Sequence, residues 1–398
     1  MNLYIKKYFT EVNWVAFVIV LFCIRYIPLE TRAGPSVIKL AVSSICAFRL
    51  LTNVIVFSRG FQLYGLYFTI VLCISYLYPQ TFRWSTIIYL LSFIITYVYI
   101  YDRIIIRQLF TFDFFIKVLK FILLMYTVVL VIQQCMLLIG IHSLPIINLT
   151  HFLDRGIGAN SLSGEPSSTA RIMTVAMLCL LRIYEYQLKH KPTITEIYKL
   201  AKYPVIGYIW SILTMGSGTG FVALGLLLLY FLQVKYVWTA LFIFCIGSIV
   251  IPYIDFVPLQ RAYDTFLATL TMDKDVIIGT DGSAASRITP LVNTITNLNL
   301  LNWHTWFGYG VDYVNNKGGY MARITGGYIG LIGEYGLISF IVMQIAAFKC
   351  FIRNFFSIET LLWIFLFAAT FANVAYVWGA MMLMTATKYF TTQKIQQQ

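Results

Sequence analysis

Two ionisable side chains stand inside long apolar stretches, where they would act out of contact with bulk water. Arg171 follows the serine-rich segment 163–168, and Glu334 lies in the glycine-rich segment 326–336. A charge at the centre of a membrane costs about 2.5–3.5 kcal/mol unless it faces a polar cavity or a partner. Each residue is therefore a candidate functional group. The alternative for Glu334 is a structural ion pair with Arg171 or Arg323.

The segment 163–168 reads Ser-Gly-Glu-Pro-Ser-Ser, which is typical of the start of a helix. The first turn of a helix presents free N–H groups and the positive end of the helix dipole, which suit a phosphate group. Arg155 precedes the segment and Arg171 follows it, so the two guanidinium groups would clamp a diphosphate. Glu165 is the acid of this segment. The alternative is that these residues only cap the helix.

A second group of candidates lies in a long polar stretch further along the chain. Arg287 precedes the segment 303–310, which reads Trp-His-Thr-Trp-Phe-Gly-Tyr-Gly. These aromatic rings fit either the membrane interface, where Trp and Tyr collect, or the faces of sugar rings. His304 is either a base or an orienting group. Residues 285–300 are predicted to form a helix along the surface.

No metal site is expected. The seven cysteines lack metal-ligand spacing, and their apolar surroundings predict buried, reduced thiols. Asp273-Lys274-Asp275 matches a metal-binding Asp-X-Asp pattern, but a three-residue match in an acidic stretch is common by chance, so it is discounted.

The composition indicates which elements must position these residues. The chain of 398 residues is 60% hydrophobic and only 11% charged, whereas soluble domains have about 25% charged residues. So few charges cannot cover a soluble body, which excludes a soluble enzyme, a disordered protein, a coiled coil and a disulfide-stapled secreted domain. The sequence predicts an all-α, polytopic integral membrane helix bundle.

A membrane-spanning helix needs about 20 mostly apolar residues, and about twelve segments approach this length. Gly216-Ser217-Gly218 divides one long apolar stretch, either as a turn between two spans or as a kink in one. The segments are 12–28, 36–57, 61–79, 84–101, 118–141, 169–187, 203–215, 218–233, 235–254, 327–350, 357–370 and 373–391.

Charge placement favours twelve spans over eleven. With the N-terminus inside, twelve spans place almost all of the net charge of +13 on the inner side, as the positive-inside rule requires. Eleven spans would move Lys349 and Arg353 to the opposite side. Both termini are then cytoplasmic. The excess of basic residues is therefore explained by the membrane topology. No nucleic acid partner is expected.

The chain is thereby divided into five regions. Two outside loops are too long to be simple connectors, and polar loops on a rigid bundle commonly carry function. The regions are 1–141 with the first five transmembrane helices, 142–168 as the first large outside loop, 169–254 with helices six to nine, 255–326 as the second large outside loop, and 327–398 with helices ten to twelve.

The order of these motifs resembles that of the O-antigen polymerase and ligase superfamily, in the branch of surface-polysaccharide polymerases. SGEPSSTA opens one span, and TMGSGTG divides the next two. A large outside loop then carries Arg287 and WFGYG, and GGYIGLIGEYGLISF follows. The resemblance covers roughly residues 150–350 and depends on order and spacing, because each motif alone is degenerate.

The resemblance implies a metal-independent glycosyltransferase without a cofactor. It would join undecaprenyl-diphosphate-linked oligosaccharides into capsule or lipopolysaccharide O-antigen chains at the periplasmic face of the bacterial inner membrane. The implied partners are the lipid bilayer and a flippase and chain-length regulator of the same pathway. The substrate-binding residues carried onto this chain are Arg155, Arg171, Arg261, Arg287 and Arg323.

The resemblance also implies catalytic residues. Glu334 matches the acid of the family's glycine-rich helix. Many relatives have His-Asn nine and eight residues before that acid, where this chain has Thr325 and Gly326. The base is therefore Glu334 or His304, and Glu165 is a further catalytic candidate.

The chemistry agrees with these assignments. A diphosphate lipid is a good leaving group, and fixed guanidinium groups stabilise the charge that builds on its bridging oxygen. The attacking sugar hydroxyl needs a nearby base. Two rivals remain. A ligase would transfer finished polymer to a lipid or protein acceptor, and a transporter or flippase would carry lipid-linked sugars along charges distributed through several spans.

Overall fold

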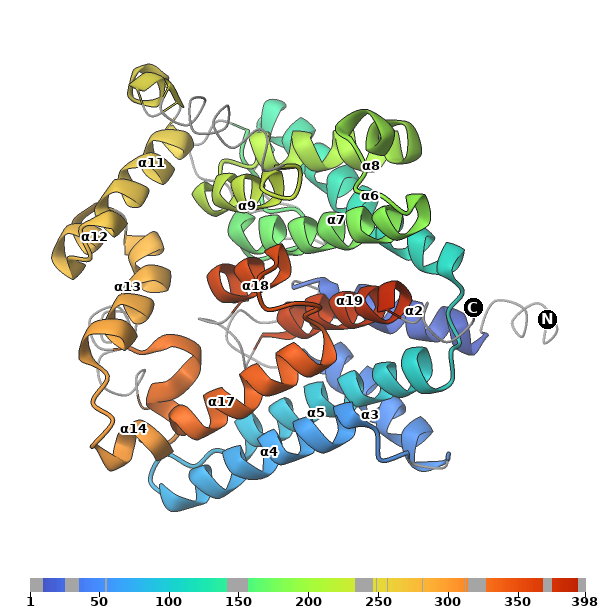
Figure 1. Ribbon diagram of the computed structural model, residues 1–398, viewed down its shortest axis with the longest axis vertical. Helices are drawn as coiled ribbons and strands as arrows, with labels where there is room; N and C mark the ends of the chain where they lie inside the picture. Colours follow the sequence, from blue (N-terminus) through green and yellow to red (C-terminus); the bar gives the residue numbers. More distant parts are fainter. Residues whose placement is uncertain are drawn as a thin grey trace.

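In this computed structural model, every regular element of the described chain is helical (Figure 1). The structure describes residues 10–25, 36–53, 56–141, 157–232, 246–247, 249–255, 257–280, 282–311, 313, 327–367 and 374–392. The longer elements are α2 (Glu11–Cys23), α3 (Val37–Leu51), α4 (Arg59–Leu77), α5 (Trp84–Tyr101), α6 (Phe112–Leu138), α7 (Pro166–Leu188), α8 (Ile194–Thr214), α9 (Gly218–Leu228), α11 (Val257–Leu270), α13 (Gly282–Asn297), α17 (Ile332–Cys350) and α19 (Ala375–Thr392).

Shorter elements complete the described chain. They are the π-helix η1 (Asp102–Ile106) after α5, the 3-10 helix η4 (Ile251–Tyr253), α12 (Lys274–Thr280), α14 (Trp303–Phe307), the 3-10 helix η5 (Ile329–Leu331) before α17, α18 (Ile358–Leu362), and the π-helix η6 (Trp363–Phe367).

Four helices of the described chain are long and apolar enough to cross a membrane: α4, α5 continued through η1, α6, and α17 with η5. The apolar helices α2 and α9 are shorter. The predicted all-helical architecture is thus confirmed, and these four helices are consistent with a membrane protein, whereas the predicted count of twelve spans is not confirmed. One reason is that the predicted span 235–254 lies mostly outside the described residues. Another is that 357–370 is broken into the short α18 and η6.

The helices run back and forth between two ends of the bundle. At one end, Arg103 after α5 pairs with Glu11 at the start of α2, with 2.8 Å between Nε and Oε1. Arg103 also donates to the carbonyl of Arg49 at the end of α3. Lys388 near the end of α19 donates to the carbonyl of Ile352, just after α17, at 2.7 Å. We call this the cationic end, defined by Arg49, Arg103, Arg107, Arg182 and Lys388.

The opposite end holds the described parts of the two predicted outside loops, and we call it the loop end. Here the Tyr78 hydroxyl, just after α4, lies 3.0 Å from Nδ1 of His304 in α14. Arg171 near the start of α7 donates to Tyr376 near the start of α19. In Figure 1 the long helices run across the view, and α11 to α14 line the left-hand side, at the loop end.

The glycine-rich break 216–218 is a turn between two helices. α8 ends at Thr214, and α9 begins at Gly218 and runs back toward the cationic end. There, beyond α9, the Leu232 carbonyl accepts a hydrogen bond from Lys191, which precedes α8, at 3.2 Å. Of the two predicted alternatives for this break, the structure has the turn between two helices rather than a kink within one.

α7 is the central helix of the bundle and packs against α6, α8, α9 and α19 (Figure 1). Every residue from Pro166 to Leu181 is buried. Pro166 occupies the first helical position, where its missing N–H costs nothing. A helix buried on all sides tolerates polar side chains that find partners inside the protein, and α7 carries several of these at its start.

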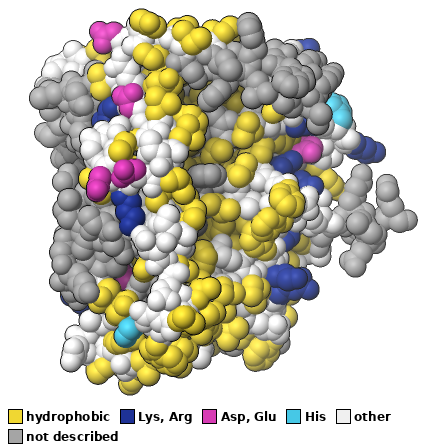
Figure 2. Space-filling model, turned by 60° about the vertical axis from the view of Figure 1, so that its left-hand side comes forward, with side chains coloured by type: hydrophobic (Ala, Val, Ile, Leu, Met, Phe, Trp, Pro, Cys, Tyr) yellow, Lys and Arg dark blue, Asp and Glu magenta, His cyan; other side chains and the backbone are white. Residues whose placement is uncertain are grey.

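The predicted outside loop 255–326 is helical over most of its described part. α11, α12 and α13 share a small core of Ala268, Ile277, Ala285 and Val292. The predicted surface helix at 285–300 is largely α13, which ends at Asn297. Figure 2 brings this side forward and shows acidic and basic side chains on it, beside a broad hydrophobic band.

The prediction that the cysteines are buried is wrong for two of them. Cys73 on α4 and Cys135 on α6 are exposed, whereas Cys23, Cys46, Cys179 and Cys350 are buried. α4 and α6 are candidate membrane spans with apolar outer faces. A side chain in an apolar stretch of such a helix can face lipid as well as the protein core.

Candidate functional site

The start of α7 forms the first cluster of candidate residues at the loop end, which we call the α7 cluster. Arg171 is 4% exposed, and its Nη1 donates to the Tyr376 hydroxyl at 2.8 Å. Arg25, just beyond the end of α2, lies over the ring of Tyr376 at 5.6 Å. The cluster comprises Arg25, Lys39, Glu165, Ser167, Ser168, Arg171 and Tyr376.

Arg25 ties this cluster to the first turn of α7. It donates to the hydroxyl of Ser168, and its Nη1 lies 3.9 Å from Oε2 of Glu165. Glu165 also accepts from the Ser167 hydroxyl at 3.1 Å. Lys39, at the start of α3, is 2% exposed and directs its ammonium toward the carbonyl of Arg25 at 3.5 Å.

The α7 cluster combines three cations with one carboxylate. Two of the cations, Lys39 and Arg171, are buried, where water screens charge weakly. The N-terminal end of the 23-residue helix α7 adds its free N–H groups and the positive end of its dipole. The arrangement is suited to binding an anion with several charged oxygens, such as a diphosphate.

The predicted arginine pair around this helix start is only partly described. Arg155 lies outside the described residues, and the arginine that the structure places close to Glu165 and Ser168 is Arg25. The sequence analysis missed Arg25 and Lys39 because they precede α7 by more than 120 residues. One feature of the sequence could have identified them. Both basic residues stand at the predicted outer ends of spans, where the positive-inside rule disfavours basic residues.

The second cluster at the loop end joins two glycine-containing motifs, and we call it the His304–Glu334 cluster. The backbone N–H of Tyr309 donates to the Gly333 carbonyl, and that of Gly310 donates to the Glu334 carbonyl, both at 3.0 Å. Gly308 and Gly336 have φ values of 68° and 76°, which favour glycine.

Close backbone approach also requires these two glycines. A side chain at Gly308 would overlap the Glu334 carbonyl, and one at Gly336 would overlap the Trp306 carbonyl. The glycines of the WFGYG and GEYG motifs are therefore the residues that allow α14 and the start of α17 to pack backbone against backbone.

His304 is oriented by groups on both sides of its ring. Its Nδ1 lies 3.0 Å from the Gly308 carbonyl, which also accepts from the Tyr78 hydroxyl at 2.7 Å. The ring stacks on Tyr309 with centroids 4.1 Å apart. Burial, and then the nearby Tyr309, raise the pKa of Tyr78, so its hydroxyl stays protonated as a donor. A proton on Nδ1 that bonds to Gly308 leaves the Nε2 lone pair available as a base.

Glu334 is the buried acid of this cluster, with 6% of its surface exposed. Its carboxylate lies within electrostatic range of Tyr67 on α4. An ion pair of Glu334 with Arg171 or Arg323 was the predicted structural alternative, and it stays a prediction. Arg171 contacts Tyr376, and Arg323 lies outside the described residues.

Helices α4 and α19, which carry residues of the two clusters, pack through aromatic side chains. Tyr64, one turn before Tyr67 on α4, packs on Trp378 of α19 with ring centroids 5.6 Å apart. Trp378 lies two residues after Tyr376, which accepts the hydrogen bond from Arg171.

Three other predicted substrate-binding arginines are not placed in either cluster. Arg261 is half-buried on α11. Arg287 lies on α13, and its side chain is outside the described part. Arg323 lies outside the described residues. Their predicted roles stay predictions.

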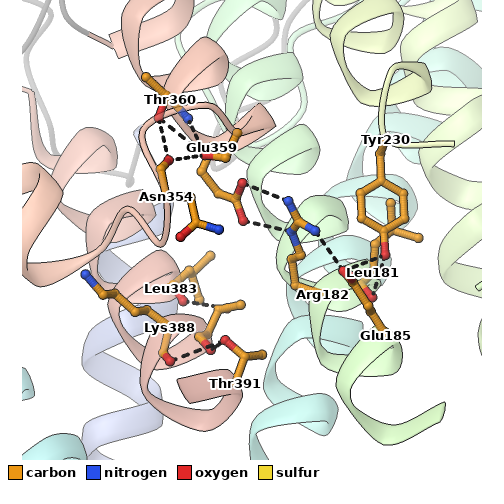
Figure 3. A network of polar contacts seen from close by, with 12 residues as sticks. Leu181, Arg182, Glu185, Tyr230, Asn354, Glu359, Thr360, Leu383, Lys388 and Thr391 are labelled. Atoms are coloured by element: carbon orange, nitrogen blue, oxygen red, sulfur yellow. Dashed lines mark hydrogen bonds and ion pairs between the residues drawn. The ribbon is translucent and has the colours of Figure 1, made fainter. Parts of the chain in front are cut away.

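A third polar cluster, at the cationic end, was not singled out from the sequence (Figure 3). Arg182 on α7 donates from Nε and Nη2 to the two oxygens of Glu359 at 2.7 and 3.0 Å. Its Nη1 donates to Glu185 at 2.7 Å, and Glu185 also accepts from Tyr230. Two carboxylates thus surround one guanidinium, which is the pattern of a structural ion-pair network.

Among the residues that the structure describes, no group of three or more His, Cys, Asp or Glu side chains is arranged to hold a metal ion. The chain matches no protein-family model, no curated protein and no solved structure.

Proposed function

We propose that this chain is a membrane glycosyltransferase that joins undecaprenyl-diphosphate-linked oligosaccharide repeats into a capsule or O-antigen polymer. The observation that carries the proposal is the α7 cluster, where Arg171 and Lys39 are buried beside the first turn of α7. A diphosphate ester has the charge and the oxygen acceptors that such a cluster binds. The order of the sequence motifs supports the same activity.

In the proposed reaction the α7 cluster holds the donor. Arg171 and Arg25 would contact the diphosphate oxygens. The buried Lys39 would add a third positive charge to the site. As the bond between the sugar and the diphosphate breaks, negative charge grows on the bridging oxygen. Guanidinium groups already fixed by Tyr376 and Ser168 stabilise that charge without having to reorganise.

The acceptor side of the reaction needs a base. We assign this role to the His304–Glu334 cluster, where His304 has Nδ1 beside the Gly308 carbonyl and Glu334 is a buried carboxylate. Glu165 was a third catalytic candidate, but its ion pair with Arg25 favours a positioning role. Holding both lipid-linked substrates in one orientation would contribute much of the remaining rate enhancement.

The proposed orientation places the loop end at the periplasmic face of a bacterial inner membrane and the cationic end in the cytoplasm. Arg49, Arg103, Arg107, Arg182 and Lys388 at the cationic end support it through the positive-inside rule. Both termini are then cytoplasmic. A flippase that supplies the lipid-linked repeat and a regulator of chain length are the proposed partners.

The experiment compares the surface polysaccharide of cells that lack the gene with that of cells complemented by variants. Arg25→Ala, Arg171→Ala, Arg287→Ala and Glu334→Gln are resolved by polymer length, with immunoblots for membrane abundance. We expect short, single-repeat chains in the deletion and with Arg171→Ala. Full-length chains from all the variants would contradict the site assignment. If the deletion instead accumulates long lipid-linked polymer that is not transferred to an acceptor, the protein is a ligase.

A second assay separates an enzyme from a carrier. Purified protein in detergent is given a synthetic lipid-linked repeat, and the products are resolved by size. Polymer formation without any other protein is expected for the transferase. A transporter or flippase would leave the repeat unchanged in detergent and would move it only across a sealed bilayer.

A further inference from the structure

The loop between α13 and α14 and the first residue of α14 carry three strongly exposed apolar side chains. Leu301 is 96% exposed, Trp303 is 60% exposed, and Leu300 is 55% exposed. Water disfavours exposed apolar groups that are gathered in one place, and such patches mark contacts with lipid or with a partner.

α4 fixes the level of this loop relative to the membrane. Its 19 residues make a helix of about 28 Å at about 1.5 Å per residue, close to the hydrocarbon thickness of about 30 Å. The end of α4 therefore lies at the membrane boundary. Tyr78, directly after α4, contacts His304. Trp303 directly precedes His304 in the sequence. Residues 300–303 thus lie close to the same boundary.

The hairpin between α4 and α5 has the surface expected at that boundary. Tyr76, Leu77 and Trp84 are exposed. The ring of Phe82 packs against Tyr76 at 5.3 Å and against Trp84 at 4.9 Å. Trp and Tyr are enriched at the membrane interface, where one part of the ring is in lipid and the other in water. His304, which directly follows residues 300–303, contacts Tyr78 of this hairpin.

We propose that residues 300–303 form a membrane anchor, in which Leu300, Leu301 and Trp303 enter the interfacial layer of the bilayer at the loop end. Leucine side chains favour lipid over sugar as the occupant, because an aliphatic group offers no ring face for a sugar to stack on. Trp303 stacks on Phe307 at 3.9 Å, so the anchor is rigidly joined to α14.

The anchor determines the level at which His304 works. His304 directly follows Trp303 and lies at the start of α14. An inserted Leu301 and Trp303 would hold the imidazole near the lipid headgroups. The inference concerns the position of the loop and stands independently of the proposed reaction.

The test attaches an environment-sensitive fluorophore, NBD, to the loop in a Leu301→Cys variant. The exposed Cys73 and Cys135, together with Cys245, are replaced by serine, and the buried cysteines remain because burial protects them from labelling. The matched control carries the label at Asp275→Cys, on the exposed surface of α12. Both proteins are reconstituted in vesicles of phosphatidylethanolamine and phosphatidylglycerol.

We expect the label at 301 to be quenched several-fold more by lipids with a nitroxide near the headgroup than the label at 275. Aqueous iodide should show the reverse order. Equal quenching of the two labels by iodide would overturn the anchor. Protection of position 301 from iodide by an oligosaccharide, with no quenching by nitroxide lipids, would also overturn it. A Leu300→Cys label serves if the first variant does not fold.

Discussion

The helix α7 carries two arginines that differ in their surroundings. Arg182, at the cationic end, is held by Glu359 through two hydrogen bonds and by Glu185 through a third. Arg171, at the loop end, donates to the hydroxyl of Tyr376 and shares its cluster with Arg25 and Lys39. The same residue type on one helix thus contacts two carboxylates at one end and lies in a cluster with two further cations at the other.

This difference separates a structural role from a binding role. A buried guanidinium between two carboxylates has its charge compensated within the protein, so it contributes to holding α7 against α18. Cations that lie close together at low dielectric repel one another, and an anionic substrate relieves that repulsion.

The largest expected effect is on activity, from Arg171→Ala. Removing one fixed donor that stabilises charge in the transition state slows a reaction by about 100–1,000-fold. The unfolding free energy should fall by about 1.5–3 kcal/mol, because the charged hydrogen bond to Tyr376 is lost. The measurements are polymer formation by purified protein and thermal unfolding in detergent. If Arg171→Ala is instead strongly destabilised and the protein that stays folded has normal activity, Arg171 has a structural role like that of Arg182.

The next effect is on stability, from Arg182→Ala. This change leaves the buried carboxylate of Glu359 without its partner, which costs about 3–5 kcal/mol. The matched control is Arg182→Met combined with Glu359→Leu, which removes the buried Arg182–Glu359 pair and should recover the part of the loss that comes from the unpaired Glu359. Chemical denaturation followed by fluorescence measures all three proteins. Equal stability of the single and double variants would show that the ion pair does not act as a unit.

A smaller loss is expected from Gly336→Ala, in the His304–Glu334 cluster. The added methyl group would overlap the Trp306 carbonyl at a backbone φ of 76°. Backbone strain of this kind costs about 1–3 kcal/mol. Gly65→Ala is the control, because nothing surrounds that position on α4. Limited proteolysis should cut the α14 region faster only in Gly336→Ala, and equal rates would contradict the packing of the two motifs.

The smallest effect is on the stability of the fold at low pH, through Glu196 in the first turn of α8. The backbone N–H and hydroxyl of Thr193 lower the pKa of Glu196 below its ordinary value of 4.5, and His190 lowers it further. This carboxylate therefore stabilises the fold above that ordinary value and loses its contribution as the pH falls through the lowered pKa. Glu196→Gln should flatten this part of the stability profile. An unchanged acid profile would argue against the capping interaction.

The sequence predicted what depends on local pattern. Apolar runs identified a helical membrane protein, and the charges inside them identified Arg171 and Glu334. Ser163 to Ser168 predicted a helix start, and Pro166 begins α7. These features need only neighbouring residues, because helix starts and apolar lengths are encoded within a few turns.

Contacts between distant segments could not be predicted in this way. Arg25 meets Ser168 across more than 140 residues, and Tyr78 meets His304 across more than 220. The glycines of WFGYG and GEYG were visible, but the backbone pairing that requires them was not. α7 was predicted as one span among twelve. Its burial on all sides depends on where four other helices pack.

The central claim is that the α7 cluster binds a diphosphate lipid through Arg171, Arg25 and Lys39. The most direct test titrates farnesyl diphosphate, a short polyprenyl diphosphate, into purified protein in detergent and measures Kd by calorimetry. Arg171→Ala should weaken binding by about 10–100-fold, as expected for the loss of a charged hydrogen bond. The Arg182→Met and Glu359→Leu double variant should bind as the unaltered protein does. Unchanged affinity in Arg171→Ala would contradict the account.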